Sequence, residues 1–228
     1  PLLRQYKSYY RLVESGVQEP LSTHADFYKR NYVYGISAYN KGAVFLHQLG
    51  YVVGDKNLKQ VLKKYIEDWK FKHPDPTDFK RIAERISGLE LDWYFEQFVE
   101  STNSIDYGIS KVESLNNKTI ITLNRIGDMP MPLDVRIDTK EGPISYNIPL
   151  RIMRGNKTSD SFLSDFKVIS DWPWVYTHYE FELPISKKEI TKITIDPSGR
   201  LADVNQENNS WLPTSSDASS PIIYKHKD

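Results

Sequence analysis

Motifs built on histidine, cysteine and serine carry most metal and nucleophilic chemistry, and this 228-residue chain has few of them. No two of its five histidines stand at the i, i+4 spacing with which one helix presents two imidazoles to zinc, so H-E-x-x-H is absent. The lack of cysteine excludes disulfides, thiolate nucleophiles and Cys-ligated zinc or iron–sulfur sites. There is no G-x-S-x-G elbow, phosphate-binding loop or dinucleotide motif. The pattern alone therefore predicts no metal site, no cofactor-binding site and no self-sufficient active site.

A few isolated polar residues still need an interpretation. We interpret His47, on an apolar helix, as a packed or rim histidine, and His73, beside two prolines, as a loop residue. Tyr39 and Lys41 belong to a short Y-x-K-G motif with Gly42, which we expect to allow the close approach of a neighbouring helix. We expect Lys41 itself to be a solvated charge without a catalytic role.

The first hundred residues must supply helices to position these side chains. Residues 2–13 show helical spacing, which ends at Ser15-Gly16, and a polar loop is expected over residues 20–34. Ser37 is the expected N-cap of the helix that carries Tyr39; we expect this helix to be interrupted near Gly50 and to end at Gly54.

Three further helices follow. Asp55 is the expected cap of the clearest one, whose apolar positions recur at helical spacing: Leu58, Val61, Leu62, Tyr65, Ile66 and Trp69. The prolines at 74 and 76 must end it. A fourth helix is predicted from Thr77 or Asp78 to Gly88, and a short aromatic one over residues 92–99.

The remainder of the chain changes to period two, which is typical of strands. Short β-branched or aromatic runs separated by Asn, Gly, Asp and Pro turns predict strands over residues 109–115, 119–125, 133–138, 144–152, 175–183 and 190–195. Strands at this spacing favour an antiparallel β-sandwich. We therefore expect an α+β multidomain chain with a helical bundle over residues 1–104, a β-sandwich over 105–205 and a polar, weakly ordered tail over 206–228.

Charge and hydropathy exclude several partners. The 30 basic and 30 acidic residues are spread evenly, without the basic excess typical of nucleic-acid or membrane-surface binding. No apolar run approaches the roughly 20 residues of a transmembrane helix. The opening Pro1-Leu2-Leu3-Arg4 is neither an initiator methionine nor a signal peptide, so we expect a piece of a longer polypeptide.

Several segments in a fixed order resemble a known family. They are Ala38-Tyr39-Asn40-Lys41-Gly42-Ala43, Leu46 and Leu49, Gly54-Asp55, Tyr65 through Trp69, Phe71-Lys72-His73-Pro74, Asp78-Phe79, and Gly88 with Leu91-Asp92-Trp93-Tyr94-Phe95. Over residues 1–100 this order resembles the downstream part of the gluzincin aminopeptidases, the zinc metallopeptidases of peptidase family M1. The β-domain, ending in Ile195-Asp196-Pro197 and Leu201-Ala202-Asp203-Val204-Asn205, is similar to the sandwich that follows the catalytic domain in bacterial members.

The resemblance implies a function and one catalytic residue. Its helical part would be the C-terminal half of a thermolysin-like catalytic domain, and Tyr39 would stabilise the oxyanion of the tetrahedral intermediate. Zinc would be the cofactor of the parent enzyme and peptide N-termini its substrates, with the upstream catalytic half as the partner of this chain. The family's zinc motif and its G-x-M-E-N strand are absent here, and Glu14 lacks the W-x-x-E-G context of the third ligand, so we interpret it as a surface residue. We therefore expect a fragment that binds no zinc and is inactive alone.

Two alternatives stay open from the sequence. One is a non-catalytic protein-interaction module, built from the helices and the sandwich. The other treats the segment from Trp172 to Tyr176 as a carbohydrate platform rather than an aromatic plug that packs domains together. The compartment is unknown, although the resemblance suggests an exported or cell-surface parent.

Overall fold

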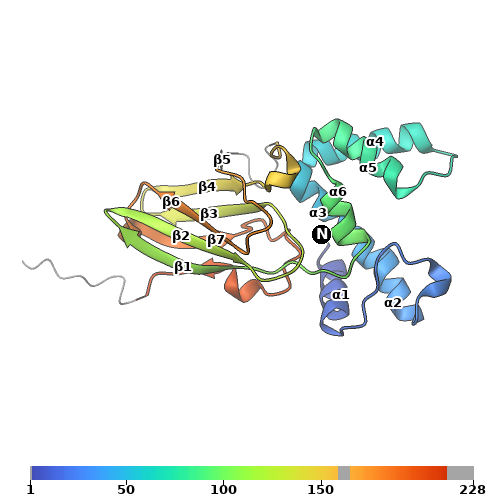
Figure 1. The fold of residues 1–228 in the computed structure, drawn as a ribbon, viewed down its shortest axis with the longest axis horizontal. Coiled ribbons are helices and arrows are strands. Elements are labelled where there is room, and N and C mark those ends of the chain that lie inside the picture. The colour runs from blue at the N-terminus through green and yellow to red at the C-terminus, as the bar shows by residue number, and fades with distance from the viewer. Residues whose placement is uncertain (1, 159–164, 215–228) are drawn as a thin grey trace, which may run out of the picture.

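The computed structural model describes residues 2–158 and 165–214, and it is an α+β structure. The helices gather at one end of an elongated molecule and the strands form a sandwich at the other (Figure 1). This arrangement confirms the predicted fold class. None of the described helices is both long enough and apolar enough to cross a bilayer.

The helical part contains all the predicted helices and some unexpected ones. In chain order its elements are α1 (Leu3–Glu14), the 3-10 helix η1 (Ala25–Phe27), α2 (Asn31–Gly35), the π-helix η2 (Ile36–Lys41), α3 (Gly42–Val53), α4 (Asp55–Trp69), α5 (Pro76–Ser87) and α6 (Asp92–Val99). The loop predicted over residues 20–34 therefore holds η1 and α2. Because α2, η2 and α3 follow one another without a break, Ser37 lies inside a helical segment and is not an N-cap.

Other helix boundaries also differ from prediction. Gly54, with φ of 86°, precedes α4, so Asp55 is its first residue rather than its cap. Helix α5 begins at Pro76, because the Asp75 carboxylate accepts from the Asp78 backbone N–H and the Asp78 side chain accepts in return from Asp75. Proline is suited to the first helical position, where no N–H donor is needed. Gly50 does not interrupt α3.

Two sheets make up the sandwich. One has the order β1-β2-β6, with β1 (Tyr107–Leu115), β2 (Lys118–Arg125) and β6 (His178–Leu183). The other has the order β5-β4-β3-β7-β8, with β3 (Leu133–Thr139), β4 (Gly142–Ile148), β5 (Lys167–Val168), β7 (Ile190–Ile195) and β8 (Ser210–Trp211). All pairs are antiparallel except β4 with β5, which is parallel.

The sandwich departs from prediction at three places. The strand expected to reach residue 152 ends at Ile148, and the 3-10 helix η3 (Arg151–Met153) follows it. β6 begins at His178 rather than 175, because residues 173–176 form a turn. Part of the predicted tail forms the 3-10 helix η5 (Gln206–Asn208) and then β8, which pairs with β7; residues 215–228 lie outside the described residues.

Buried polar contacts join helix α3 to the sandwich. The Tyr51 hydroxyl accepts from the Asp134 backbone N–H at 2.8 Å, and the Asp134 carboxylate pairs with Lys157 at 2.6 Å, both side chains being buried. Arg200 pairs with Asp55 at 3.0 Å. The hydrophobic core also runs continuously from the helices into the sheets. These contacts with the sandwich fix the orientation of α3, and therefore of the π-helix that precedes it.

Candidate functional site

The segment around Tyr39 is the part of the helical region whose backbone is most unusual. Tyr39 lies in the π-helix η2, which α1, α2 and α3 all contact. Short π-helical turns within α-helices occur frequently at functional sites. The Tyr39 side chain is 75% exposed, whereas Ser37 and Lys41 on either side of it are buried. The fold therefore holds the phenol out into solvent on a helical segment that α1 packs against.

Lys41 points the opposite way from Tyr39. Two residues along a helix rotate a side chain by about 200°, so the two side chains of the motif must lie on opposite faces. The Lys41 Nζ donates to the Ser101 carbonyl at 3.3 Å and lies 5.6 Å from the centre of the Phe98 ring. Burial lowers the pKa of Lys41 from 10.5 to about 8. The expectation of a solvated lysine is wrong: Lys41 anchors the π-helix to the end of α6.

A sequence signal for this burial was present and was missed. Lys41 precedes the buried Val44, Phe45 and Gln48 at spacings of three, four and seven, so it belongs to the inward stripe of the helix. The expectation for Gly42 was also wrong: a Cβ there would meet one backbone oxygen at 3.8 Å, an ordinary contact. Close approach occurs instead at Gly50, where a Cβ would lie 2.9 Å from a Leu58 methyl.

Further aromatic side chains are exposed in the residues that precede Tyr39 in the chain. They are Phe27 at 76%, Tyr32 at 55% and Tyr34 at 39%. The Tyr34 ring packs edge-to-face on Tyr28 at a centroid distance of 5.4 Å. Tyr32 and Tyr34 are two residues apart on α2 and therefore lie on opposite sides of it. These side chains are single exposed aromatics, which are common on protein surfaces, and they do not form one face.

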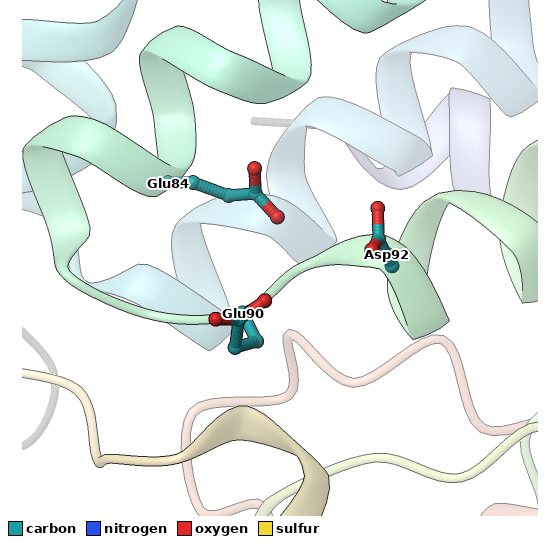
Figure 2. Close-up of side chains that lie close together, drawn as sticks. All are labelled: Glu84, Glu90 and Asp92. Carbon is teal, nitrogen blue, oxygen red and sulfur yellow. The ribbon is translucent and has the colours of Figure 1, made fainter.

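The described residues do not fit a zinc ion. Protein zinc sites are built mainly from His nitrogen and Cys sulfur in tetrahedral geometry, and some catalytic sites add one Asp or Glu oxygen to histidines. Within residues 2–158 and 165–214, the group of acidic or histidine side chains close enough to share an ion is Glu84, Glu90 and Asp92, on α5, the following loop and the start of α6 (Figure 2). It has no histidine, and its carboxylates are already engaged. Glu84 accepts from the Leu91 backbone N–H at 3.0 Å, and the other two pair with Arg154 and Lys80.

His47 is a half-buried residue at the junction of α1 and α3, as predicted for a packed or rim histidine. Its Nδ1 lies 2.8 Å from the Tyr6 hydroxyl, which also donates to the Arg200 carbonyl. Burial, and then the charge of Arg200, lower the pKa of His47. Glu14 is exposed, as predicted, and His73 is an exposed loop residue.

The two tryptophans of the proposed carbohydrate platform lie in different environments. Trp172 is 1% exposed and stacks on Tyr179 at a centroid distance of 5.2 Å, so it is a packing plug. Trp174 is 45% exposed. A platform made of both tryptophan rings is therefore excluded, because only Trp174 of the two is exposed to a ligand.

One family model matches the helical part of this chain, and one solved structure shares its fold. Residues 6–98 match the model of the peptidase family M1 domain. The fold is similar to that of aminopeptidase A from Legionella pneumophila, solved in complex with aspartic acid, at 12% identity and a TM-score of 0.50. That match covers 75% of this chain and 18% of the Legionella chain, so this chain spans less than a fifth of its structural relative. No curated protein sequence matches.

Proposed function

Since residues 6–98 carry part of an M1 peptidase domain, we propose that this chain is the C-terminal part of a zinc-dependent aminopeptidase that removes N-terminal residues from peptides. One observation carries the proposal furthest. Tyr39, the residue to which the resemblance assigns a catalytic role, lies inside the matched segment with its phenol exposed on a tightly packed π-helix. A packing tyrosine would be expected to face inward.

Tyr39 acts as a hydrogen-bond donor in this proposal. The O–H of a phenol can donate a hydrogen bond to an oxyanion. A preorganised donor of this kind lowers an activation barrier by on the order of 3–4 kcal/mol. The Lys41 anchor on the opposite face would keep the phenol from moving as charge develops on the scissile carbonyl oxygen.

The remaining machinery belongs to another part of the enzyme. Zinc supplies a polarised water and a Lewis acid in such enzymes, and the described residues here offer no ligand set for it. The upstream catalytic half is therefore the partner that this chain requires, and the exposed side of η2 that carries Tyr39 is where the peptide would lie. We also propose the division into a catalytic part over residues 1–104, a sandwich over 105–205 and a tail over 206–228.

The first test uses the chain alone. Its zinc content is measured by elemental analysis, and its turnover is measured with a set of aminoacyl anilides. We expect neither bound zinc nor hydrolysis. Turnover accompanied by one zinc per chain would show that this polypeptide is complete as an enzyme, and the proposal of a fragment would be abandoned.

The second test uses the intact parent enzyme. Replacing Tyr39→Phe removes only the phenol oxygen, so kcat should fall about 10²–10³-fold while the zinc content is unchanged. Tyr176→Phe is the matched control, because Tyr176 is 57% exposed on a loop of the sandwich. Equal turnover in the wild-type and Tyr39→Phe enzymes would reduce Tyr39 to a surface tyrosine.

A further inference from the structure

A cavity lies where the helical part meets the sandwich, away from Tyr39. Its volume is about 470 Å³, within the range of small-ligand sites. The residues around this seam cavity come from the start of α6, from η3 and from the loop before β6: Glu90, Asp92, Trp93, Arg151, Ile152, Arg154, Pro173, Trp174 and Val175. It therefore combines two indole rings and three aliphatic groups with four charged side chains.

The loop that carries Trp174 is held rigidly. The indole N–H of the buried Trp172 donates to the Tyr176 carbonyl at 2.9 Å, and the Tyr176 backbone N–H donates to the Pro173 carbonyl at the same distance. Arg125 donates to the Trp174 carbonyl at 3.1 Å. An exposed ring on a fixed backbone binds a ligand with little further loss of conformational entropy.

The charges of the seam cavity are balanced. Two are cationic and two anionic, and each has an opposite charge nearby: Arg151–Asp171 at 3.2 Å, Arg154–Glu90 at 3.8 Å and Asp92–Lys80. A charged ligand would find no net field of the opposite sign. The guanidinium groups, with five N–H donors each, and the carboxylates, with several lone pairs, still have capacity for uncharged hydroxyl groups.

We propose that the seam cavity binds a neutral saccharide. A sugar ring has an apolar face of C–H groups and an edge of hydroxyls, and the cavity offers a matching exposed indole beside paired donors and acceptors. The ring face would pack on Trp174, and the hydroxyls would bond to the Arg154 and Glu90 side chains. This site does not depend on the proposed peptidase function.

The lining favours a sugar over an extended peptide. Peptides commonly bind by adding a strand to a sheet edge, where backbone groups provide the affinity. The residues of the seam cavity belong to a helix start, a 3-10 turn and two loops, and none lies in a strand. The cavity thus offers side chains rather than a row of backbone partners.

The experiment titrates the full chain with neutral mono- and disaccharides, followed by tryptophan fluorescence and by NMR chemical shifts. We expect saturable millimolar or tighter binding of at least one sugar. Trp174→Ala should weaken it about tenfold or more, since the ring loses its stacking contact. Tyr176→Ala is the matched control: its side chain is exposed on the same loop but does not line the cavity, so affinity should be unchanged.

Three results would overturn the proposal. They are the absence of saturable binding across the neutral panel, equal affinity in Trp174→Ala and wild type, and binding of charged sugars or peptides with no neutral sugar bound. Urea unfolding of each variant checks folding. If Trp174→Ala unfolds, Trp174→Phe keeps a ring and should lose only part of the affinity and most of the fluorescence response. Full affinity in Trp174→Phe with the fluorescence response of wild type would count against the site, because the signal would then come from another tryptophan.

Discussion

Lys41 makes the stability of this protein depend on pH in the alkaline range. Its amine is buried, with a pKa of about 8 in the folded state against 10.5 in the unfolded chain. Between these values the unfolded chain binds more protons than the folded protein, so the free energy of unfolding rises with pH. Below pH 8 both states are charged, and the burial penalty is present in full. Lys41→Met keeps the length of the side chain and removes the titration.

The size of this effect follows from the two pKa values. By linkage, the free energy of unfolding of wild type should rise by about 2 kcal/mol more than that of Lys41→Met between roughly pH 7.5 and pH 9.5. With a urea dependence of about 2 kcal/mol per molar, the midpoint difference between the two proteins should change by about 1 M. The comparison removes the contribution of the buried tyrosines, which is common to both proteins.

The assay is urea unfolding of both proteins, followed by far-UV circular dichroism at several pH values across this range. Lys41→Met should show the weaker rise of its midpoint with pH. A midpoint difference that stays constant from pH 7.5 to 9.5 would mean that the folded-state amine titrates normally, and the inward anchoring of Lys41 would then be refuted.

Three other predictions concern glycine packing and buried charge. Gly42→Ala should stabilise the protein by up to about 1 kcal/mol, because alanine favours a helix. Gly50→Ala should gain less than Gly42→Ala, because its new methyl group must displace the Leu58 methyl at 2.9 Å and the Arg200 guanidinium at 3.1 Å. Thermal unfolding that ranks the two variants the other way would contradict the packing. Lys157→Met should lower the free energy of unfolding by about 3–5 kcal/mol, because it removes the cation that pairs with the buried Asp134 carboxylate. The double variant Lys157→Met with Asp134→Leu should regain much of this stability in urea unfolding. A loss below about 1 kcal/mol in Lys157→Met would argue against a buried pair. Burial raises the pKa of Asp203 from 3.8 to about 6. Between these values the folded protein binds more protons than the unfolded chain, so the free energy of unfolding of wild type relative to Asp203→Asn should fall as pH rises from about 4 to 6. A difference between the two proteins that does not change with pH would contradict the raised pKa.

Periodicity determined the element types because it reports which face of each segment is buried. The apolar stripe of α4 and the period-two runs of β2, β3 and β7 predicted those elements closely. Helix α2 was missed because its five residues are too few to show a 3.6-residue period. The start of α5 was predicted at Thr77 or Asp78, one or two residues after its actual start at Pro76, because the prolines were interpreted as breakers rather than as the first helical position.

The order of motifs along the chain was also enough to indicate peptidase family M1, whose model matches residues 6–98. The environments of Lys41, Trp172 and Trp174 were decided by tertiary structure. Lys41 is buried because the end of α6, some 60 residues later, covers it. Trp172 and Trp174 are the same residue type two positions apart, and Trp172 is buried because it packs on Tyr107 and Tyr179 of the strands, whereas Trp174 is 45% exposed. A sequence specifies the chemistry of a side chain, but its solvation depends on what the rest of the chain places against it.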